Sequence, residues 1–222
     1  NNQPYTLKSE GNYTFAYIPD TQNTIKFTPE VSDAATDWLI GNREEIGLKG
    51  VMHVGDLVEN WDSDEQWQSA EQAFLPLAQA GIPTTFVPGN HDFSGSNLES
   101  YHKYFGEDSS YAAAMAENGN TVTFEPAGED TRQAASYTFV EGGSYTYLLI
   151  QLMYEPNDTE LAWLERVLSA YPSYPAMITS HNIFSCSEAE PDECTLNEQG
   201  ERIWNVAKKH DNVFMLTGGH NH

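Results

Sequence analysis

Apolar runs of strand length that end in a polar residue recur along the whole chain, and this pattern constrains the fold most strongly. The polar groups that follow five such runs are Asp20-Thr21-Gln22, Gly55-Asp56, Gly89-Asn90-His91-Asp92, Ser180-His181-Asn182 and Gly219-His220-Asn221-His222. In open α/β sheets, ligands bind outside the carboxyl ends of the strands. The sequence therefore predicts that several metal-binding types of side chain meet at one edge of a sheet.

Strand-like and helix-like stretches alternate along the chain. We expect strands over residues 13–18, 50–54, 84–87, 136–140, 145–152, 176–180 and 213–217, the fourth and fifth forming a hairpin. Helices are expected after Pro29, after Asp62-Ser63-Asp64, from Asp158 and over residues 198–209. Residues 94–130 are expected to be irregular, apart from one short amphipathic piece at 101–105. This alternation is typical of an α/β protein, and we expect residues 1–222 to form a single domain.

The charge of the chain excludes some classes of partner. Ten basic residues against 33 acidic ones give a net charge of −23 at pH 7. Binding to duplex DNA or to an anionic membrane surface depends on Lys and Arg contacts to phosphate, so we expect neither partner. Membrane insertion is also not expected, because no stretch approaches the roughly 18 apolar residues of a membrane span. An acidic composition is also common in secreted and salt-adapted proteins.

The two cysteines allow two interpretations. Cys186 and Cys194 lie eight positions apart in a polar loop. In an exported protein they would close a local disulfide, whereas in a reducing compartment they would be two free thiols. The first residues are polar and lack Met, so we expect the numbering to begin inside a longer precursor. We expect a bacterial protein with an extracellular, cell-surface or periplasmic location.

The polar groups carry more information together than singly. A Gly-Asp pair alone is usually a turn, and a lone His is usually a hydrogen-bonded polar residue. Together they supply carboxylates, imidazoles and amide oxygens, which suit Mn, Fe or Zn better than Ca. At these residues the chain resembles the calcineurin-like metallophosphoesterases, whose blocks read D-x-H, G-D, G-N-H-D/E, an isolated H and G-H-x-H.

The resemblance extends from Asp20 to His222 and implies a fold. Members of that family form an α/β/β/α sandwich of two mixed sheets flanked by helices, with a dinuclear metal site at the carboxyl ends of the strands. Family domains usually continue beyond the last block with closing strands. The chain stops at His222, so the resemblance implies that it lacks the last strands of the domain.

The resemblance also assigns roles to residues of the polar groups. Seven residues are expected to hold two metal ions, with Asp56 as the bridge: Asp20, Gln22 and His222 on the first ion, and Asn90, His181 and His220 on the second. Asn90 and His91 are expected to bind the phosphoryl group. His91 would protonate the leaving oxygen, and Asp92 would orient His91 by accepting its other ring N–H.

The function implied by the resemblance is hydrolysis of a small phosphate ester, either a monoester or a diester, by a metal-bridging hydroxide. The two ions would be Mn, Fe or Zn. Mn is favoured because Gln22 stands where the family usually has His, and a neutral amide oxygen is a harder ligand than imidazole. A non-catalytic cell-surface module with a structural metal site is the alternative. The sequence leaves the substrate and the oligomeric state open.

Three aromatic residues and one further histidine are expected to have roles in the core or beside the site. Trp61 and Tyr154 follow strand ends or ligand loops, so they either line the substrate cleft or pack in the core. We expect Trp67 to pack in the core. His53 lies within a predicted strand and is expected in the core or behind the metal ligands.

Overall fold

The structure is a computed structural model that describes residues 13–126, 134–186 and 193–220. It is an α/β protein whose strands form two main sheets and one short hairpin. The smaller sheet has the order β1-β2-β3: β1 (Thr14–Ile18), β2 (Leu48–His53) and β3 (Thr84–Phe86). The larger sheet has the order β10-β7-β6-β5-β4: β10 (Val213–Thr217), β7 (Ala176–Thr179), β6 (Tyr145–Gln151), β5 (Ser136–Gly142) and β4 (Val122–Phe124). The hairpin consists of β8 (Phe184–Cys186) and β9 (Cys194–Leu196).

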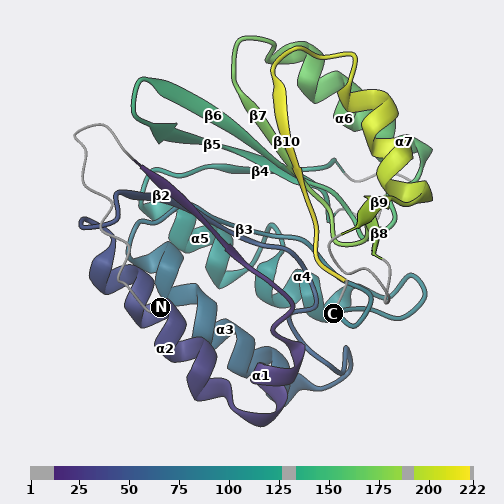
Figure 1. The fold of residues 1–222 in the computed structure, drawn as a ribbon. Coiled ribbons are helices and arrows are strands. Elements are labelled where there is room, and N and C mark those ends of the chain that lie inside the picture. Colours follow the sequence, from purple (N-terminus) through teal and green to yellow (C-terminus); the bar gives the residue numbers. More distant parts are fainter. Residues whose placement is uncertain (1–12, 127–133, 187–192, 221–222) are drawn as a thin grey trace.

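The two main sheets lie face to face between two groups of helices (Figure 1). The smaller sheet is covered by α1 (Gln22–Phe27), α2 (Pro29–Asn42), α3 (Asp64–Gln79), α4 (Glu99–Phe105) and α5 (Ser110–Glu117). The larger sheet is covered by α6 (Asp158–Ala170) and α7 (Glu198–Ala207). Of the helices in the described ranges, none is long and apolar enough to cross a membrane.

The expectation of two mixed sheets is wrong for the smaller sheet. Its described strands are all parallel, because each connection between them runs through helices and returns the chain in the same direction. The larger sheet is mixed: β10, β7 and β6 are parallel, and β6, β5 and β4 are antiparallel.

Separate apolar clusters fill the spaces between the layers. Leu148 and Ile150 of β6 pack in the cluster beneath α6 and α7, whereas Leu149 packs between the two sheets with Met52 and Met177. Alternate side chains of a strand point to opposite faces of a sheet, so one strand contributes to both clusters. The cluster beneath α3, α4 and α5 includes seven buried aromatic residues, among them Trp67, which is fully buried as expected.

Seven strands, the long helices and α4 lie where the sequence predicts them, whereas α1, α5, β4, β8 and β9 are new. Both α5 and β4 lie in the segment that was expected to be irregular. A three-residue strand such as β4 has no pattern of its own and exists through its pairing with β5. α6 begins at Asp158, as expected, and its N-cap is Asn157, which forms a reciprocal capping box with Glu160.

Candidate metal centre

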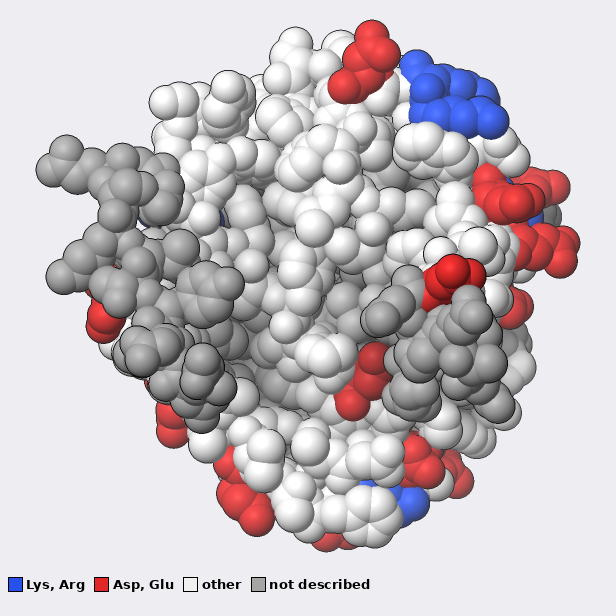
Figure 2. Space-filling view, in the orientation of Figure 1, with Lys and Arg blue, Asp and Glu red and all other residues white. Residues whose placement is uncertain are grey.

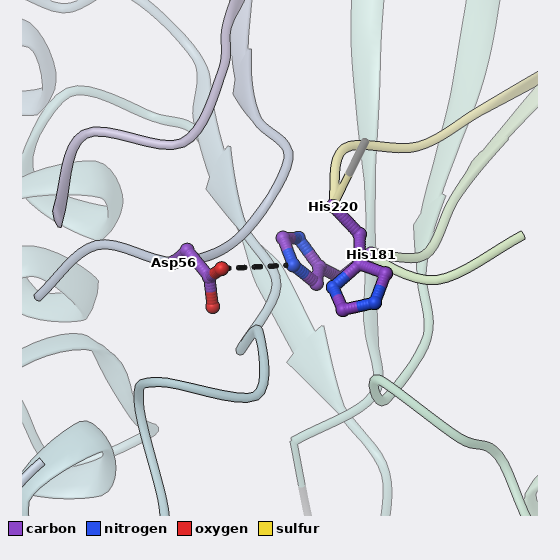
Figure 3. A group of neighbouring side chains, drawn as sticks. All are labelled: Asp56, His181 and His220. Atoms are coloured by element: carbon purple, nitrogen blue, oxygen red, sulfur yellow. Dashed lines mark ion pairs between the residues drawn. The ribbon is translucent and has the colours of Figure 1, made fainter. Parts of the chain in front are cut away.

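The carboxyl ends of strands from both sheets meet at one place in the molecule. Asp20, Asp56 and Asn90 follow the three neighbouring strands β1, β2 and β3. His181 and His220 follow the neighbouring strands β7 and β10 of the other sheet. Ligand atoms of Asp56, His181 and His220 all lie within 4.8 Å of one another (Figure 3). Residues far apart in the sequence therefore form one compact cluster.

Direct contacts connect the two sheets at this cluster. Asp56 Oδ2 lies 3.1 Å from His181 Nε2, and Asp20 Oδ1 lies 3.6 Å from His181 Nδ1. The backbone N–H of His220 donates to Asp20 Oδ1 over 3.1 Å, and His220 Nδ1 lies 2.8 Å from Asn90 Oδ1. The structure thus brings together five of the seven residues predicted as metal ligands.

The pair of His181 and Asp56 is arranged to enclose a positive charge. The carbonyl oxygen of Val54 lies 2.7 Å from His181 Nδ1, so that nitrogen carries the hydrogen and donates. A neutral ring would then present the lone pair of Nε2 to the Asp56 carboxylate, which is favourable only with a proton or a cation between them. Burial is the largest single effect and lowers the pKa of His181, but Asp56, the Val54 carbonyl and Asp20 together raise it above its ordinary value. Burial is the largest single effect and raises the pKa of Asp56, but His181 and His91 together lower it below its ordinary value.

Gln22, a predicted ligand of the first ion, has a buried side-chain oxygen. The residue is 2% exposed and is the first residue of α1. Its Oε1 is buried and has no hydrogen-bond partner within the described ranges. Burial of an amide oxygen without a partner is costly, and a metal ion would satisfy it. Gln22, the carboxylates and the imidazoles therefore fit a site for transition-metal ions. His222 lies outside the described residues.

The backbone is strained at three of the predicted ligands. Asp20, Asp56 and His220 have φ values of 28°, 51° and 72°, and they are the non-glycine residues with positive φ in the described part of the chain. Such conformations cost roughly 1–3 kcal/mol each and gather at functional sites. They turn each side chain towards the cluster directly after its strand.

Two glycines allow the site to close. A Cβ atom on Gly89 would lie 2.1 Å from Asp56 Oδ1, and one on Gly55 would lie 2.4 Å from His181 Nδ1. Gly55 also has a φ of 107°, which residues with a side chain avoid. The glycines of the Gly-Asp and Gly-Asn-His-Asp groups are thus required by the packing of the ligands themselves.

The predicted contact between Asp92 and the ring of His91 is wrong. Asp92 is 1% exposed, and its carboxylate accepts from the backbone N–H groups of Leu57, Val58 and Gly89. Burial and the charge of Asp56 raise the pKa of Asp92 to about 7, against the lowering effect of these N–H groups. Asp92 therefore ties the loop after β2 to the loop after β3, because adjacent side chains of this turn point in different directions.

Glu59 takes the place that was predicted for Asp92. His91 Nδ1 lies 3.2 Å from the Glu59 carbonyl oxygen and 3.3 Å from its carboxylate Oε2. The His91 side chain is 35% exposed, and its backbone N–H donates to Asp56 Oδ1 over 2.9 Å. Sequence reasoning missed this role of Glu59. Its position three residues after Asp56 was the available signal.

His53 lies behind the ligands, as expected. It is 1% exposed, accepts from the Gly55 N–H through Nδ1, and contacts the Thr21 hydroxyl through Nε2 at 2.9 Å. Burial, and to a lesser degree the charge of His181, lower its pKa to about 3. A neutral His53 thus links the turn that carries Asp20 to the turn that carries Asp56.

The two aromatic residues with open interpretations differ in their surroundings. The carbonyl oxygen of Trp61 accepts from Trp67 Nε1 over 2.8 Å, which anchors the loop before α3. The ring of Tyr154 lies 5.8 Å from the ring of His181 and 5.6 Å from that of His220. Tyr154 therefore belongs to the surroundings of the cluster.

Comparisons with known proteins agree with this geometry. The family model described as calcineurin-like phosphoesterase matches residues 13–222. An uncharacterized protein, YvnB of Bacillus subtilis (strain 168), is 26% identical over 213 residues, which cover 95% of this chain and 15% of that protein. The crystal structure of a dimetal phosphatase from Danio rerio is similar in fold, with a TM-score of 0.56 and 14% identity over 96% of this chain and 82% of that chain. The chain belongs to the calcineurin-like phosphoesterase family.

Proposed function

We propose that this protein hydrolyses a small phosphate ester, a monoester or a diester, in a metal-dependent reaction. The observation that carries the proposal is the convergence of Asp56, His181 and His220 from two sheets within 4.8 Å, in a member of this family. The partly exposed side chain of His91, whose backbone N–H donates to Asp56 of that cluster, provides a further group for chemistry.

The residues at the cluster fit two metal ions. Asp56 would bridge them, with Asp20, Gln22 and His222 on one ion and Asn90, His181 and His220 on the other. Mn, Fe and Zn suit this mixture of ligands, and the amide oxygen of Gln22 favours Mn. Such ions, when bound, polarise the phosphoryl group, activate a water and offset the negative charge of both protein and substrate.

His91 would transfer a proton to the leaving oxygen. With its Nδ1–H donated to Glu59, the ring presents Nε2 on its opposite side. The hydrogen bond from its backbone N–H to Asp56 holds the backbone of His91 next to the predicted bridging carboxylate, and Glu59 holds the ring. Asn90 would bind the phosphoryl group from the same loop. General acids positioned in this way contribute about 10²–10⁴-fold to a rate.

The test combines metal content with hydrolysis of a chromogenic monoester and diester in Mn²⁺. We expect about two metal ions per chain in the wild type, and loss of both metal and turnover in Asp56→Ala. Asp37→Ala, which changes an exposed carboxylate on α2, is the control and should behave like the wild type. Turnover retained in Asp56→Ala would exclude this site as the active site. Metal binding by a wild type that hydrolyses neither ester would favour the non-catalytic module.

Two wider features belong to the same proposal. Residues 1–222 would form one catalytic domain. Export to an extracellular, cell-surface or periplasmic location is supported by the disulfide between Cys186 and Cys194, since such bonds persist in oxidising compartments.

A further inference from the structure

Tyr154 follows β6 and packs its ring against the predicted metal ligands. Its ring centroid lies 5.8 Å from that of His181, 5.6 Å from that of His220 and 6.1 Å from that of Phe93. Phe93 follows the group that carries Asn90 and His91. The phenol therefore lies at the border of the metal cluster, and it is only partly buried.

A chain of side-chain amides connects Tyr154 to the start of α7, and its first member has a fixed polarity. Asn197 is the N-cap of α7, and its Oδ1 accepts from the backbone N–H of Gly200 over 2.9 Å. A backbone N–H can only donate, so the atom of the Asn197 side-chain amide that faces Gly200 must be its oxygen. The Nδ2 of Asn197 therefore points the other way and donates to Asn182 Oδ1 over 2.6 Å and to the Phe184 carbonyl over 3.3 Å.

The polarity of Asn197 determines that of the next two groups. Because Asn182 Oδ1 accepts from Asn197, Asn182 must present its Nδ2 to Tyr154, and it donates to the phenol oxygen over 3.3 Å. The phenol oxygen is then an acceptor in this contact, and its own hydrogen points elsewhere. Every hydrogen bond in the chain is thus donated in the direction of Tyr154.

The hairpin of β8 and β9 holds the two amides in place. It connects Asn182 to Asn197, and the backbone N–H of Asn197 donates to the Ile183 carbonyl over 3.1 Å. The disulfide between Cys186 and Cys194 joins the two strands of the hairpin. Backbone hydrogen bonds and a disulfide therefore position the two asparagines that orient the phenol.

We propose that the phenol O–H of Tyr154 donates a hydrogen bond to a phosphoryl oxygen of the substrate, with its direction set by Asn182 and Asn197. The proposal rests on the proposed function and adds a substrate-binding residue to it. A purely packing role would need the ring alone, whereas this role needs the hydroxyl.

The experiment compares Tyr154→Phe with the wild type in two assays on Mn²⁺-loaded protein. One is hydrolysis of the chromogenic esters, and the other is titration of inorganic phosphate by calorimetry. We expect kcat/KM and phosphate affinity each to fall by about 10- to 100-fold, the range for loss of a hydrogen bond to a charged group. Metal content and Tm should stay unchanged. Tyr174→Phe is the control, because Tyr174 precedes β7 at the opposite end of that strand from His181.

A second variant tests the polarity of the chain. Asn182→Asp places a carboxylate between Asn197 and the phenol, and a carboxylate only accepts, so it would capture the phenol hydrogen. Tyr154→Phe should then have no effect in the Asn182→Asp background, although it is harmful in the wild type. Equal effects of Tyr154→Phe in both backgrounds would overturn the role of Asn182.

The outcomes separate this inference from the proposed function. A wild type that hydrolyses the esters, with a Tyr154→Phe variant of equal kcat/KM and equal phosphate affinity, overturns the inference alone. A wild type without turnover overturns the proposed function, and phosphate titration then decides on Tyr154. Weaker phosphate binding in Tyr154→Phe supports the inference, whereas equal binding, or none in the wild type, contradicts it.

Discussion

At the scale of single residues, the site depends on backbone conformations and contacts that few other residues would tolerate. Asp20, Asp56 and His220 hold positive φ angles, and Gly89 leaves room for the Asp56 carboxylate. The strain is a local cost that the packed sheets on either side must offset. Because of these conformations, each side chain lies at the cluster although it is only two or three residues beyond the end of its strand.

A substitution at Gly89 should therefore damage both the fold and the site. The added methyl group of Gly89→Ala would meet Asp56 Oδ1 at 2.1 Å and the Asp56 backbone nitrogen at 2.4 Å. We expect a loss of about 1–3 kcal/mol in the free energy of unfolding, measured by urea denaturation, together with reduced metal content. Gly41→Ala is the matched control: nothing lies within 4 Å of a Cβ atom added at Gly41, and alanine in a helix should stabilise by up to about 1 kcal/mol. Equal stability of the two variants would refute the packing argument.

His91 and Glu59 should affect the rate without affecting metal binding. Neither residue is a predicted ligand, and they contact each other through His91 Nδ1. We expect His91→Ala to lower kcat by about 10²–10⁴-fold with the metal content unchanged. Glu59→Gln should have a smaller effect, because the Glu59 carbonyl oxygen still accepts from the ring. Metal analysis and steady-state kinetics check both variants, and loss of metal in His91→Ala would contradict its assignment as a proton donor.

At the scale of elements, a buried carboxyl pair lies between the end of β4 and the start of α6. Glu125 is 3% exposed, and neither of its carboxyl oxygens has a hydrogen-bond partner within the described ranges. Glu160, which is fully buried, closes the capping box of α6. Burial, and then the charge of Glu160, raise the pKa of Glu125 to about 7, and Arg166 partly opposes this shift. Folding thus favours the protonated form of Glu125.

This shift predicts a dependence of stability on pH with a definite sign. The folded pKa of Glu125 lies above its ordinary value of 4.5, so its contribution is complete below pH 4.5 and is lost as the pH rises through about 7. The glutamine in Glu125→Gln cannot ionise, so the stability of this variant does not decrease in that way as the pH rises. We expect the stability of the wild type relative to that variant to fall by roughly 1–3 kcal/mol between pH 5 and pH 8. Urea unfolding across this range is the measurement, and parallel pH curves for the two proteins would disprove the shift.

At the scale of the whole molecule, the fold places two sheets face to face and an acidic surface around them. Acidic residues lie at several places around the visible face, and few basic ones accompany them (Figure 2). The net charge of −23 acts against the compact state through self-repulsion. The same charge repels anions, so the proposed function requires positive charge at the cluster to attract a phosphate ester.

Salt should therefore stabilise this protein. Raising the NaCl concentration from 0.05 M to 0.5 M shortens the Debye length from more than 10 Å to less than 8 Å and weakens the repulsion. We expect the free energy of unfolding to rise, with an unchanged slope of that energy against urea concentration. Stability that is flat or falls with salt would show that local ion pairs, rather than the net charge, dominate.

The sequence by itself determined seven of the strands, the long helices and the types of residue that meet at the site. Each polar group is a short segment that directly follows an apolar strand, so its position at a sheet edge is a local property. The sequence did not reveal β4, which exists through its pairing with β5, or α5, which lies in the segment expected to be irregular. It also could not show that α2 leaves Val31 and Trp38 52% and 56% exposed, because the spacing of apolar residues does not say which face packs.

Only the tertiary structure decided which groups contact one another within the site. The partner of His91 is Glu59 rather than its neighbour Asp92, whose carboxylate is held by three backbone N–H groups. The orientation of Tyr154 depends on a helix cap 43 positions away in the sequence, at Asn197. The physical reason is that hydrogen bonds act over about 3 Å. Neighbours at that distance are determined by packing between elements and not by the order of residues along the chain.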